Sequence, residues 1–167
     1  MAKNSNVHFY IVGSNPTEQV RQLAKSANIV VTGRVSDVRP YLKHARLSVA
    51  PLRISRGIQN KVLEAMAMEC LVITTSLAAE GINAQANTDL IIANNEIEFA
   101  AACLKYIEHS DKDKIGVTAR NYVLTNYLWK DNLRKLQHCL EHPSQHAKLA
   151  MPTDKKHIGL NKSTQTL

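Results

Sequence analysis

The residues best suited to chemistry lie between positions 50 and 68, where an apolar run gives way to a loop and then to a helical pattern. The loop carries Arg53, Arg56 and Gly57. The helical pattern begins near Gln59 and has Lys61 in its first turn. Backbone N–H groups at a helix N-terminus attract anions, a glycine lets the main chain approach them, and nearby cations strengthen the attraction. The segment therefore predicts a phosphate cradle.

A single carboxylate follows this cradle. Glu64 stands about one turn inside the predicted helix, between apolar residues. A carboxylate accepts hydrogen bonds from the paired hydroxyls of a sugar, and cations with helix amides hold phosphates. The combination suggests a site for a nucleoside diphosphate.

Short apolar runs alternate with helical patterns along the rest of the chain. The predicted strands cover 7–13, 29–32, 47–50, 71–75 and 89–93, and the predicted helices cover 16–27, 38–42, 59–68, 95–109, 111–127 and 128–141. Strands this short, continuous and apolar are typical of a parallel sheet that is covered on both faces. The expected fold is therefore α/β, a Rossmann-like open parallel sheet with helices on both faces and further helices at its C-terminal end.

The same pattern sets the expected domain boundary. One domain is predicted over residues 1–141, and the composition turns polar from His142 onward. In that last segment Lys148, Lys155, Lys156 and Lys162 face only Asp154. We expect residues 142–167 to form a basic, disordered tail.

Other strand ends supply further candidate binding residues, because ligands of open parallel sheets bind beyond the carboxyl ends of the strands. Gly13-Ser14-Asn15 follows the first predicted strand and Gly33-Arg34-Val35 the second. The stretch from Ser76 to Gly81, which includes Glu80, follows the fourth. Each glycine alone is ordinary turn chemistry, and the expected convergence of the loops makes them candidates.

Composition narrows the functional classes. The net charge of +7 favours phosphate-bearing partners, but 5% aromatic residues and no basic run among stacking residues argue against nucleic acid. Peripheral contact with an anionic membrane surface is compatible with this charge. No stretch is apolar enough to cross a membrane or resembles a leader at the N-terminus, so a cytoplasmic location is expected. The three cysteines lack metal-ligand spacing and are expected to be reduced thiols.

Four segments in order carry a family resemblance. They are Val12-Gly-Ser-Asn15, Thr32-Gly-Arg-Val-Ser-Asp37, Tyr41-Leu-Lys-His-Ala-Arg-Leu-Ser-Val-Ala-Pro51 and Lys61-Val-Leu-Glu-Ala-Met-Ala67. Together they resemble the C-terminal domain of GT-B glycosyltransferases of group 1 (family 4), most closely the sugar transferases of bacterial exopolysaccharide systems. The resemblance extends over about residues 7 to 141.

The resemblance implies transfer of a sugar from a UDP- or GDP-sugar, with retention at the anomeric carbon and without a metal. It implies that Gly57, Gln59, Asn60 and Lys61 face the phosphates and that Glu64 binds the ribose. It places the base at Gly33, Arg34 and Val35. Glu80 and Gly81 are secondary candidates on the loop after the fourth predicted strand, and Gly13 is a candidate on the loop after the first.

One departure concerns catalysis directly. The family pairs two glutamates separated by seven residues, and the first of these positions holds Arg56 here. Arg56 and Glu64 are thus the candidate catalytic residues, and an arginine at this place suits a diphosphate or an acidic sugar. A second departure is Glu69-Cys70-Leu71, where relatives have glycine and proline, which predicts an altered helix end.

The resemblance also implies an absent half. The family's active site lies between two domains, and this chain begins at what resembles the second strand of the C-terminal one. We therefore expect donor binding without turnover unless an N-terminal domain or a partner chain completes the site. Trp129 is expected either on a surface meant for that partner or in the core.

Three other classes of protein share parts of this sequence pattern. A nucleotide-sugar epimerase of GT-B fold would use the same nucleotide half, and a non-catalytic Rossmann-like binding domain would share the pattern. A receiver-like module is disfavoured, because its strand ends need acidic residues. Asp111-Lys-Asp113 spells a metal-binding pattern of another transferase class, but it opens a predicted helix and favours N-capping.

Overall fold

The computed structural model describes residues 7–108 and 111–141, so the predicted tail at 142–167 lies outside the described residues. The chain separates into two compact units, Met1–Asn126 and Tyr127–Leu167. The expected domain boundary at residue 141 stays a prediction.

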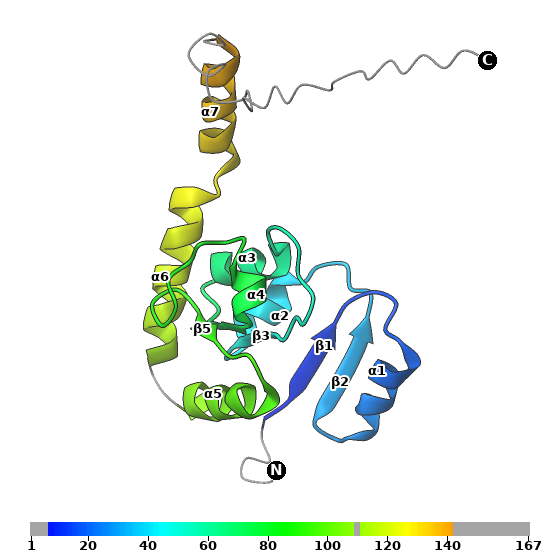
Figure 1. Cartoon of the computed structure of the whole chain (residues 1–167). Coiled ribbons are helices and arrows are strands. Elements are labelled where there is room, and N and C mark those ends of the chain that lie inside the picture. Colours follow the sequence, from blue (N-terminus) through cyan, green and yellow to red (C-terminus); the bar gives the residue numbers. More distant parts are fainter. Residues whose placement is uncertain (1–6, 109–110, 142–167) are drawn as a thin grey trace, which may run out of the picture. The chain divides into compact units, whose positions relative to one another are not determined.

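The first unit alternates strands and helices, as Figure 1 shows. Its strands are β1 (Phe9–Val12), β2 (Ile29–Gly33), β3 (Ser48–Ala50), β4 (Val72–Thr74) and β5 (Ile91–Ile92). Its helices are α1 (Glu18–Gln22), a 3₁₀ turn at Leu23–Lys25, α2 (Arg39–His44), α3 (Asn60–Ala67), α4 (Ser76–Ala79), α5 (Glu96–Glu108) and α6 (Asp111–Asn126). All strand pairs are parallel, which confirms the α/β class. The short helix α4 lies where only a loop was expected.

The strands form two sheets where a single one was predicted. β1 pairs with β2, and β3, β4 and β5 form a second sheet in that order. Phe9 and Tyr10 of β1 are about half exposed, and α1 has no buried residue. A helix of five residues is too small to cover a sheet, so these strands stay partly open to solvent.

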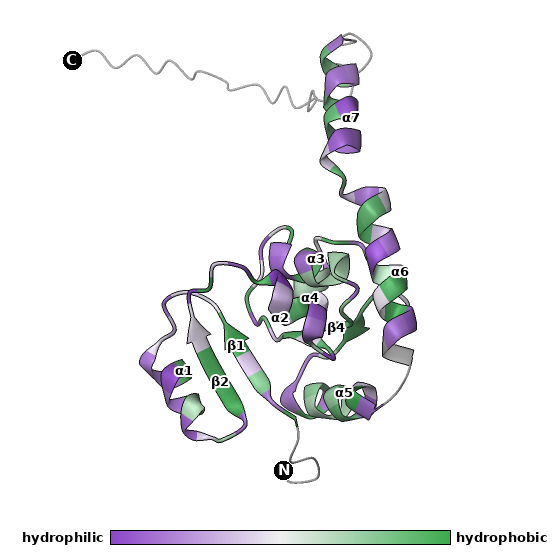
Figure 2. Cartoon of the chain, turned by 180° about the vertical axis from the view of Figure 1, so that it is seen from behind, coloured by the Kyte–Doolittle hydropathy of each residue, from purple (hydrophilic) through white to green (hydrophobic). Residues whose placement is uncertain are grey.

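The core sits in the second sheet. All three residues of β4 are buried, and this strand is coloured as hydrophobic in Figure 2. Leu71, Ile73 and Ile91 pack with Tyr106 of α5 and Ile115 of α6. Each such fully buried side chain contributes about 1.5–3 kcal/mol relative to exposure, so this sheet holds most of the stabilising burial.

The C-terminal end of α3 lies directly against α6. A Cβ atom on Gly116 of α6 would be 2.1 Å from the carbonyl oxygen of Glu69, a distance that real Cβ atoms do not reach. Glu69 has a φ of 59°, which is the left-handed conformation usually taken by glycine at a helix end. Arg120 donates from Nη1 to the carbonyl oxygen of Ala67 at 2.8 Å. Glu69 thus adopts the conformation that glycine would have supplied.

The second unit contains α7 (Trp129–Glu141). The helix begins after Leu128, whose carbonyl accepts from the backbone of Asp131 and Asn132 at 3.2 and 3.1 Å. Trp129 is exposed, so within its own unit the core alternative is wrong. The helices α5, α6 and α7 match their predicted ranges within two residues.

Candidate functional site

No side chain of the described residues caps the N-terminus of α3 with a hydrogen bond. Gln59 precedes the helix, and its carbonyl accepts from Val62 and Leu63 at 2.9 and 3.2 Å, but its side chain caps none of the helix amides. The Gln59 Nε2 atom donates instead to the carbonyl oxygen of Arg56 at 3.3 Å. The first backbone amides of a helix have no intrahelical acceptor, so those of Asn60 and Lys61 lie at the positive end of α3. This end is suited to an anion.

The residues around this helix end have the exposure that binding requires. Gly57 has a φ of 64°, in the region that favours glycine, and gives the loop its turn before α3. Arg56, Lys61 and Glu64 are exposed, whereas Val62, Ala65 and Met66 on the other side of α3 are buried. The predicted cations and carboxylate therefore face solvent on one side of a helix that the core holds in place.

The chain just beyond α4 touches the loop of Gly57 through the main chain. A Cβ on Gly81 would be 2.7 Å from the carbonyl oxygen of Gly57. Upstream, Thr75 donates from Oγ1 to the carbonyl oxygen of Leu52 at 2.8 Å and accepts from Ala78 N at 3.1 Å, which caps α4. Glu80 ends α4 and is exposed. The fold thus brings two of the predicted loops, those of Gly57 and Gly81, into direct contact.

A third loop joins them from the end of β5. The Asn94 Oδ1 atom accepts from the backbone N and the hydroxyl of Ser76, at 3.0 and 2.9 Å. Arg53, expected in the phosphate cradle, forms an exposed ion pair with Glu96 at the start of α5. The strand ends of β3, β4 and β5 are therefore tied into one surface.

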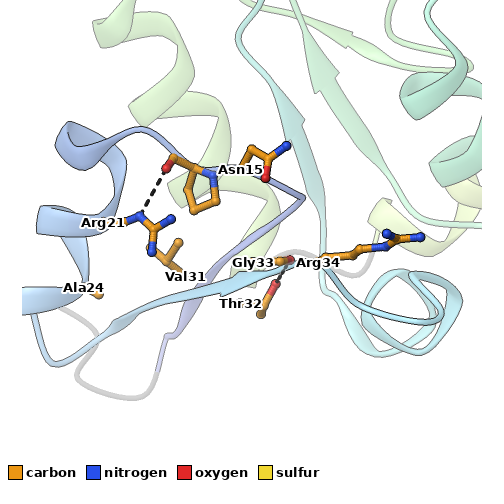
Figure 3. A pocket seen from close by; sticks show the side chains of 8 residues that line it. Asn15, Arg21, Ala24, Val31, Thr32, Gly33 and Arg34 are labelled. Atoms are coloured by element: carbon orange, nitrogen blue, oxygen red, sulfur yellow. Dashed lines mark hydrogen bonds between the residues drawn. The ribbon is translucent and has the colours of Figure 1, made fainter.

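The loops after β1 and β2 form a second group. The Gly13 amide donates to the carbonyl oxygen of Gly33 at 3.2 Å, and Thr32 Oγ1 donates to the same oxygen at 2.9 Å. Beside them lies a cavity of about 460 Å³ whose lining includes Asn15, Arg21 and Arg34. Figure 3 shows that the Arg34 side chain extends away from Arg21, whose Nε donates to the carbonyl oxygen of Pro16 at 3.2 Å.

The predicted site residues consequently fall into two sets. The helix set comprises Arg56, Gly57, Gln59, Asn60, Lys61, Glu64 and Glu80. The cavity set comprises Gly33 and Arg34, which line the cavity, Gly13, whose amide donates to Gly33, and the partly buried Val35. All belong to strand-end loops or to the helices that follow them, as predicted. No strand pairing among residues 7–108 and 111–141 joins the two sets, since β1 and β2 pair only with each other.

Sequence reasoning missed three residues of this surface. Ser55 has a buried hydroxyl without a hydrogen-bond partner among the described residues, two positions before Gly57. Thr75 and Asn94 hold the strand ends together, as described above. Thr75 and Asn94 follow strands, so the expectation that ligands bind beyond strand ends would have found them. Ser55 stands between two loop arginines, and nothing in the sequence marks its hydroxyl.

The loop after β2 carries a carboxyl whose pKa is lowered in the folded chain. The Arg39 guanidinium donates to both carboxylate oxygens of Asp37 at 2.9 to 3.0 Å, and the Arg39 backbone N donates to Oδ1 at 2.9 Å. These hydrogen bonds hold the pKa of Asp37 below its usual value. Asp37 therefore holds Arg39, the first residue of α2, although the N-cap of that helix is Val38 and no side chain caps it.

Comparison with known sequences gives a family and a partial relative. Residues 1–109 match the sequence model of the family described as glycosyl transferases group 1. An uncharacterized 44.6 kDa protein in the cps region of Klebsiella pneumoniae is 30% identical over 80 residues. These residues are 47% of this chain and 21% of that protein.

Solved structures of glycosyltransferases share the fold. A glycosyltransferase from Rickettsia africae ESF-5 superposes with a TM-score of 0.70 at 22% identity, over 82% of this chain and 40% of that one. HepE from Anabaena, solved in complex with UDP, gives a TM-score of 0.69 at 12% identity, over 83% of this chain and 42% of that one. At these identities the likeness shows the fold, and the chain spans less than half of either solved chain.

Proposed function

The chain belongs to the group 1 glycosyl transferases, and from this premise we propose that it binds the nucleoside diphosphate sugar of a retaining transferase. The proposal depends chiefly on the uncapped N-terminus of α3, with Gly57 before it and Lys61 in its first turn. A diphosphate leaving group gains charge as the glycosidic bond breaks. Helix amides and cations stabilise that charge most in the transition state, so they lower the barrier and also hold the donor.

The roles of the neighbouring side chains follow from their positions. Glu64, one turn into α3 and exposed, is the proposed acceptor for the ribose hydroxyls. Arg56 is the proposed cation on the diphosphate or on an acidic donor sugar, in place of the usual carboxylate. Ser55, with its buried and unpartnered hydroxyl, is an additional donor available to the phosphates.

The cavity set is the proposed contact for the base. Gly33 and Arg34 line the cavity, and the Gly13 amide holds the loop of Gly33 in place. An arginine guanidinium stacks on planar rings, which suits a nucleobase. The solved Anabaena structure is a complex with UDP, and this supports UDP as the first ligand to test.

Turnover is proposed to need a second domain. The chain spans 21% of the Klebsiella protein and 40 to 42% of the two solved glycosyltransferases. We take the acceptor half to come from an N-terminal domain or a partner polypeptide, so this chain alone binds donor without transfer. We further propose a glycan or lipid-linked acceptor in polysaccharide biosynthesis, in line with the cps region of the relative, and a location at the cytoplasmic side of the membrane.

Titration of the ¹⁵N-labelled chain with UDP and GDP tests donor binding. The expected result is a saturable shift of the backbone amides from Gly57 to Glu64, together with Gly33 and Arg34. Glu64→Ala should weaken the binding of UDP about tenfold, because the ribose hydroxyls lose a charged acceptor. Amide shifts are preferable to fluorescence, because the single tryptophan lies in the second unit.

Glu108→Ala is the matched control. Glu108 is also exposed on a helix, but it lies at the end of α5 that is remote from the strand-end loops. UDP should bind this variant as it binds the natural chain. Absence of any amide shift at millimolar UDP and GDP would contradict the donor site, and equal losses in the two variants would contradict the role of Glu64.

A further inference from the structure

One arginine of the loop between β3 and α3 is already engaged by a carboxylate. Arg53 donates from Nη2 to the Oε1 atom of Glu96 and forms an ion pair with it. Glu96 is the first residue of α5, so the pair joins the end of β3 to the helix that follows β5. The two side chains are 84 and 78% exposed. Solvent therefore reaches both charges, and an incoming anion can compete for the arginine.

The carboxylate of Glu96 is not needed to begin α5. The Asn95 Oδ1 atom accepts from the backbone N of Glu98 at 2.9 Å, which caps the helix. The Glu98 carboxylate accepts in turn from Asn94 N and Asn95 Nδ2, both at 2.6 Å. Among the described residues, the Glu96 side chain has Arg53 as its one partner. It can lose that partner without disturbing the start of α5.

The segment 53–56 is anchored at both of its ends but not in between. Before it, Thr75 Oγ1 donates to the carbonyl oxygen of Leu52 at 2.8 Å. After it, Gly57 is packed against Gly81. Within the described part of the chain, residues 53–56 form no backbone–backbone hydrogen bond. Segments with few such bonds rearrange at a low cost in free energy, so a change of partner here leaves the neighbouring elements in place.

The proposed phosphate site has no net charge as it stands. Its ionisable side chains are Arg56, Lys61, Glu64 and Glu80, all exposed, and none of them forms an ion pair with a described residue. A nucleoside diphosphate sugar carries a negative charge on each phosphate, and a helix N-terminus supplies only about half a positive charge. More than one charge of the donor is left unbalanced. Arg53 is the next cation in the same loop.

We propose that Arg53 exchanges the carboxylate of Glu96 for the diphosphate of the donor, so that Glu96 is a built-in competitor for this cation. The exchange rests on the proposed donor site, to which it adds Arg53 as a binding residue and Glu96 as a positioning residue. A guanidinium binds phosphate through two parallel N–H donors, and two phosphates carry more charge than one carboxylate. Arg53 lies four residues before Gly57, so their Cα atoms are at most about 14 Å apart.

A fixed link between the β3 loop and α5 is the alternative role of the pair. Exposed ion pairs contribute little to stability in water, so such a link would be weak. The strand ends are also joined without it, by Thr75 with Leu52 and by Asn94 with Ser76. The two roles predict effects of opposite sign. Removing a structural link from beside the site would weaken donor binding, whereas removing a competitor strengthens it.

UDP titration of two single variants tests the exchange, with the amides from Gly57 to Glu64 as the readout. Arg53→Gln should weaken binding about fivefold, because a charge-assisted contact to phosphate is lost. Glu96→Gln should strengthen it about two- to fivefold, because UDP no longer displaces a carboxylate. Unchanged or weaker binding by Glu96→Gln would overturn the exchange.

Glu108→Gln is the matched control for the loss of a negative charge. Glu108 is exposed at the other end of α5, about 18 Å along the helix from Glu96. Salt screens charges over such a distance, so this variant should change UDP binding by less than about 1.5-fold. A gain equal to that of Glu96→Gln would show a general effect of charge and would overturn the exchange.

The double variant Arg53→Gln with Glu96→Gln separates release of the arginine from local repulsion of the donor. Once Arg53 is absent, Glu96→Gln has no arginine to release and should change the affinity for UDP by less than about 1.5-fold. An equal gain in the two backgrounds would show that Glu96 acts only by repelling the donor, and would overturn the exchange.

The side chain of Arg53 also gives a direct signal. Its Nε–Hε resonance, identified by its loss in Arg53→Gln, should shift when UDP is added to the natural chain. If UDP shifts the amides of α3 but leaves this resonance unchanged, the exchange is overturned and the donor site stands. Equal binding of UDP by Arg53→Gln and the natural chain has the same meaning. If UDP shifts no amide at all, the donor site and the exchange are both overturned.

Discussion

A Cβ atom on Gly81 would lie 2.7 Å from the carbonyl oxygen of Gly57 and 3.1 Å from the backbone nitrogen of Ile58. The loop after α4 is therefore packed on the main chain of the loop that leads into α3. The turn at Gly57 owes its position to this contact as well as to its own conformation. Gly81 has no side chain to offer a ligand, yet its close approach to Gly57 shapes the loop of the proposed phosphate site.

Gly81→Ala tests this dependence. The methyl group can be accommodated only if one loop moves, so we expect a loss of about 1–3 kcal/mol in the free energy of unfolding and weaker UDP binding. Gly13→Ala is the control for stability, because a Cβ there meets no atom within 4 Å. Chemical denaturation and the UDP titration measure the two effects. A Gly81→Ala protein as stable as Gly13→Ala would contradict the close contact.

Glu69→Gly is expected to stabilise the chain. Glu69 has a φ of 59°, and the left-handed conformation costs an L-residue about 1–2 kcal/mol. The exposed ion pair of Glu69 with Arg120, at 3.5 Å, contributes little in water. Part of the gain is offset by the greater flexibility of glycine in the unfolded chain, so we expect a net gain of about 0.5–1 kcal/mol.

Ala101→Gly is the comparison for this substitution. Ala101 is exposed in the interior of α5, where glycine should lower the free energy of unfolding by about 1 kcal/mol. Urea denaturation of the two variants should therefore give changes of opposite sign. Changes of the same sign would show that Glu69 carries no conformational strain.

The pair of Asp37 and Arg39 predicts a pH dependence. The pKa of Asp37 is lowered in the folded chain by hydrogen bonds from Arg39, so this carboxylate stabilises the fold above its unfolded pKa of about 3.9. The stabilisation is lost as the pH falls through the lowered folded pKa. Asp37→Asn should therefore lower the melting temperature more at pH 6 than at pH 3. A difference that is constant over this range would contradict the pairing.

The three cysteines should react at different rates. Cys139 is exposed, Cys103 is partly buried and Cys70 is buried. Burial raises the pKa of the Cys103 thiol, so at pH 8 it has less of the reactive thiolate than an ordinary cysteine. Peptide mass spectrometry after iodoacetamide should show the order Cys139, Cys103, Cys70, and unfolding in urea should abolish it. Equal rates for Cys103 and Cys139 in the folded chain would contradict this burial.

The accuracy of the sequence-based predictions followed the length and regularity of each pattern. The helices α5, α6 and α7 are long enough for a helical repeat to be read, and their predicted ends are close to those observed. The predicted helix over 16–27 became a helix of five residues and a 3₁₀ turn, because it has no buried face to extend it. The helix α4 was missed because its four residues give a single turn.

Sheet pairing depends on contacts between distant segments, which no local pattern contains. Periodicity identified each of the five strands, but it could not show that β1 and β2 pair apart from β3. The proposed site shows the same difference between local patterns and contacts of distant segments. Gly57, Lys61 and Glu64 could be chosen from residue type and position, whereas the contact of Gly57 with Gly81 joins loops that are far apart in sequence.

The contact between Gly116 and Glu69 restricts substitution at residue 116 more than at residue 69. Every L-amino acid other than glycine places its Cβ at the same point, so no substitution at Gly116 would be milder than alanine while α6 keeps this position. At residue 69, glycine and asparagine would fit the backbone at least as well as glutamate. We therefore expect natural variants of this chain to differ at residue 69 and to keep glycine at residue 116.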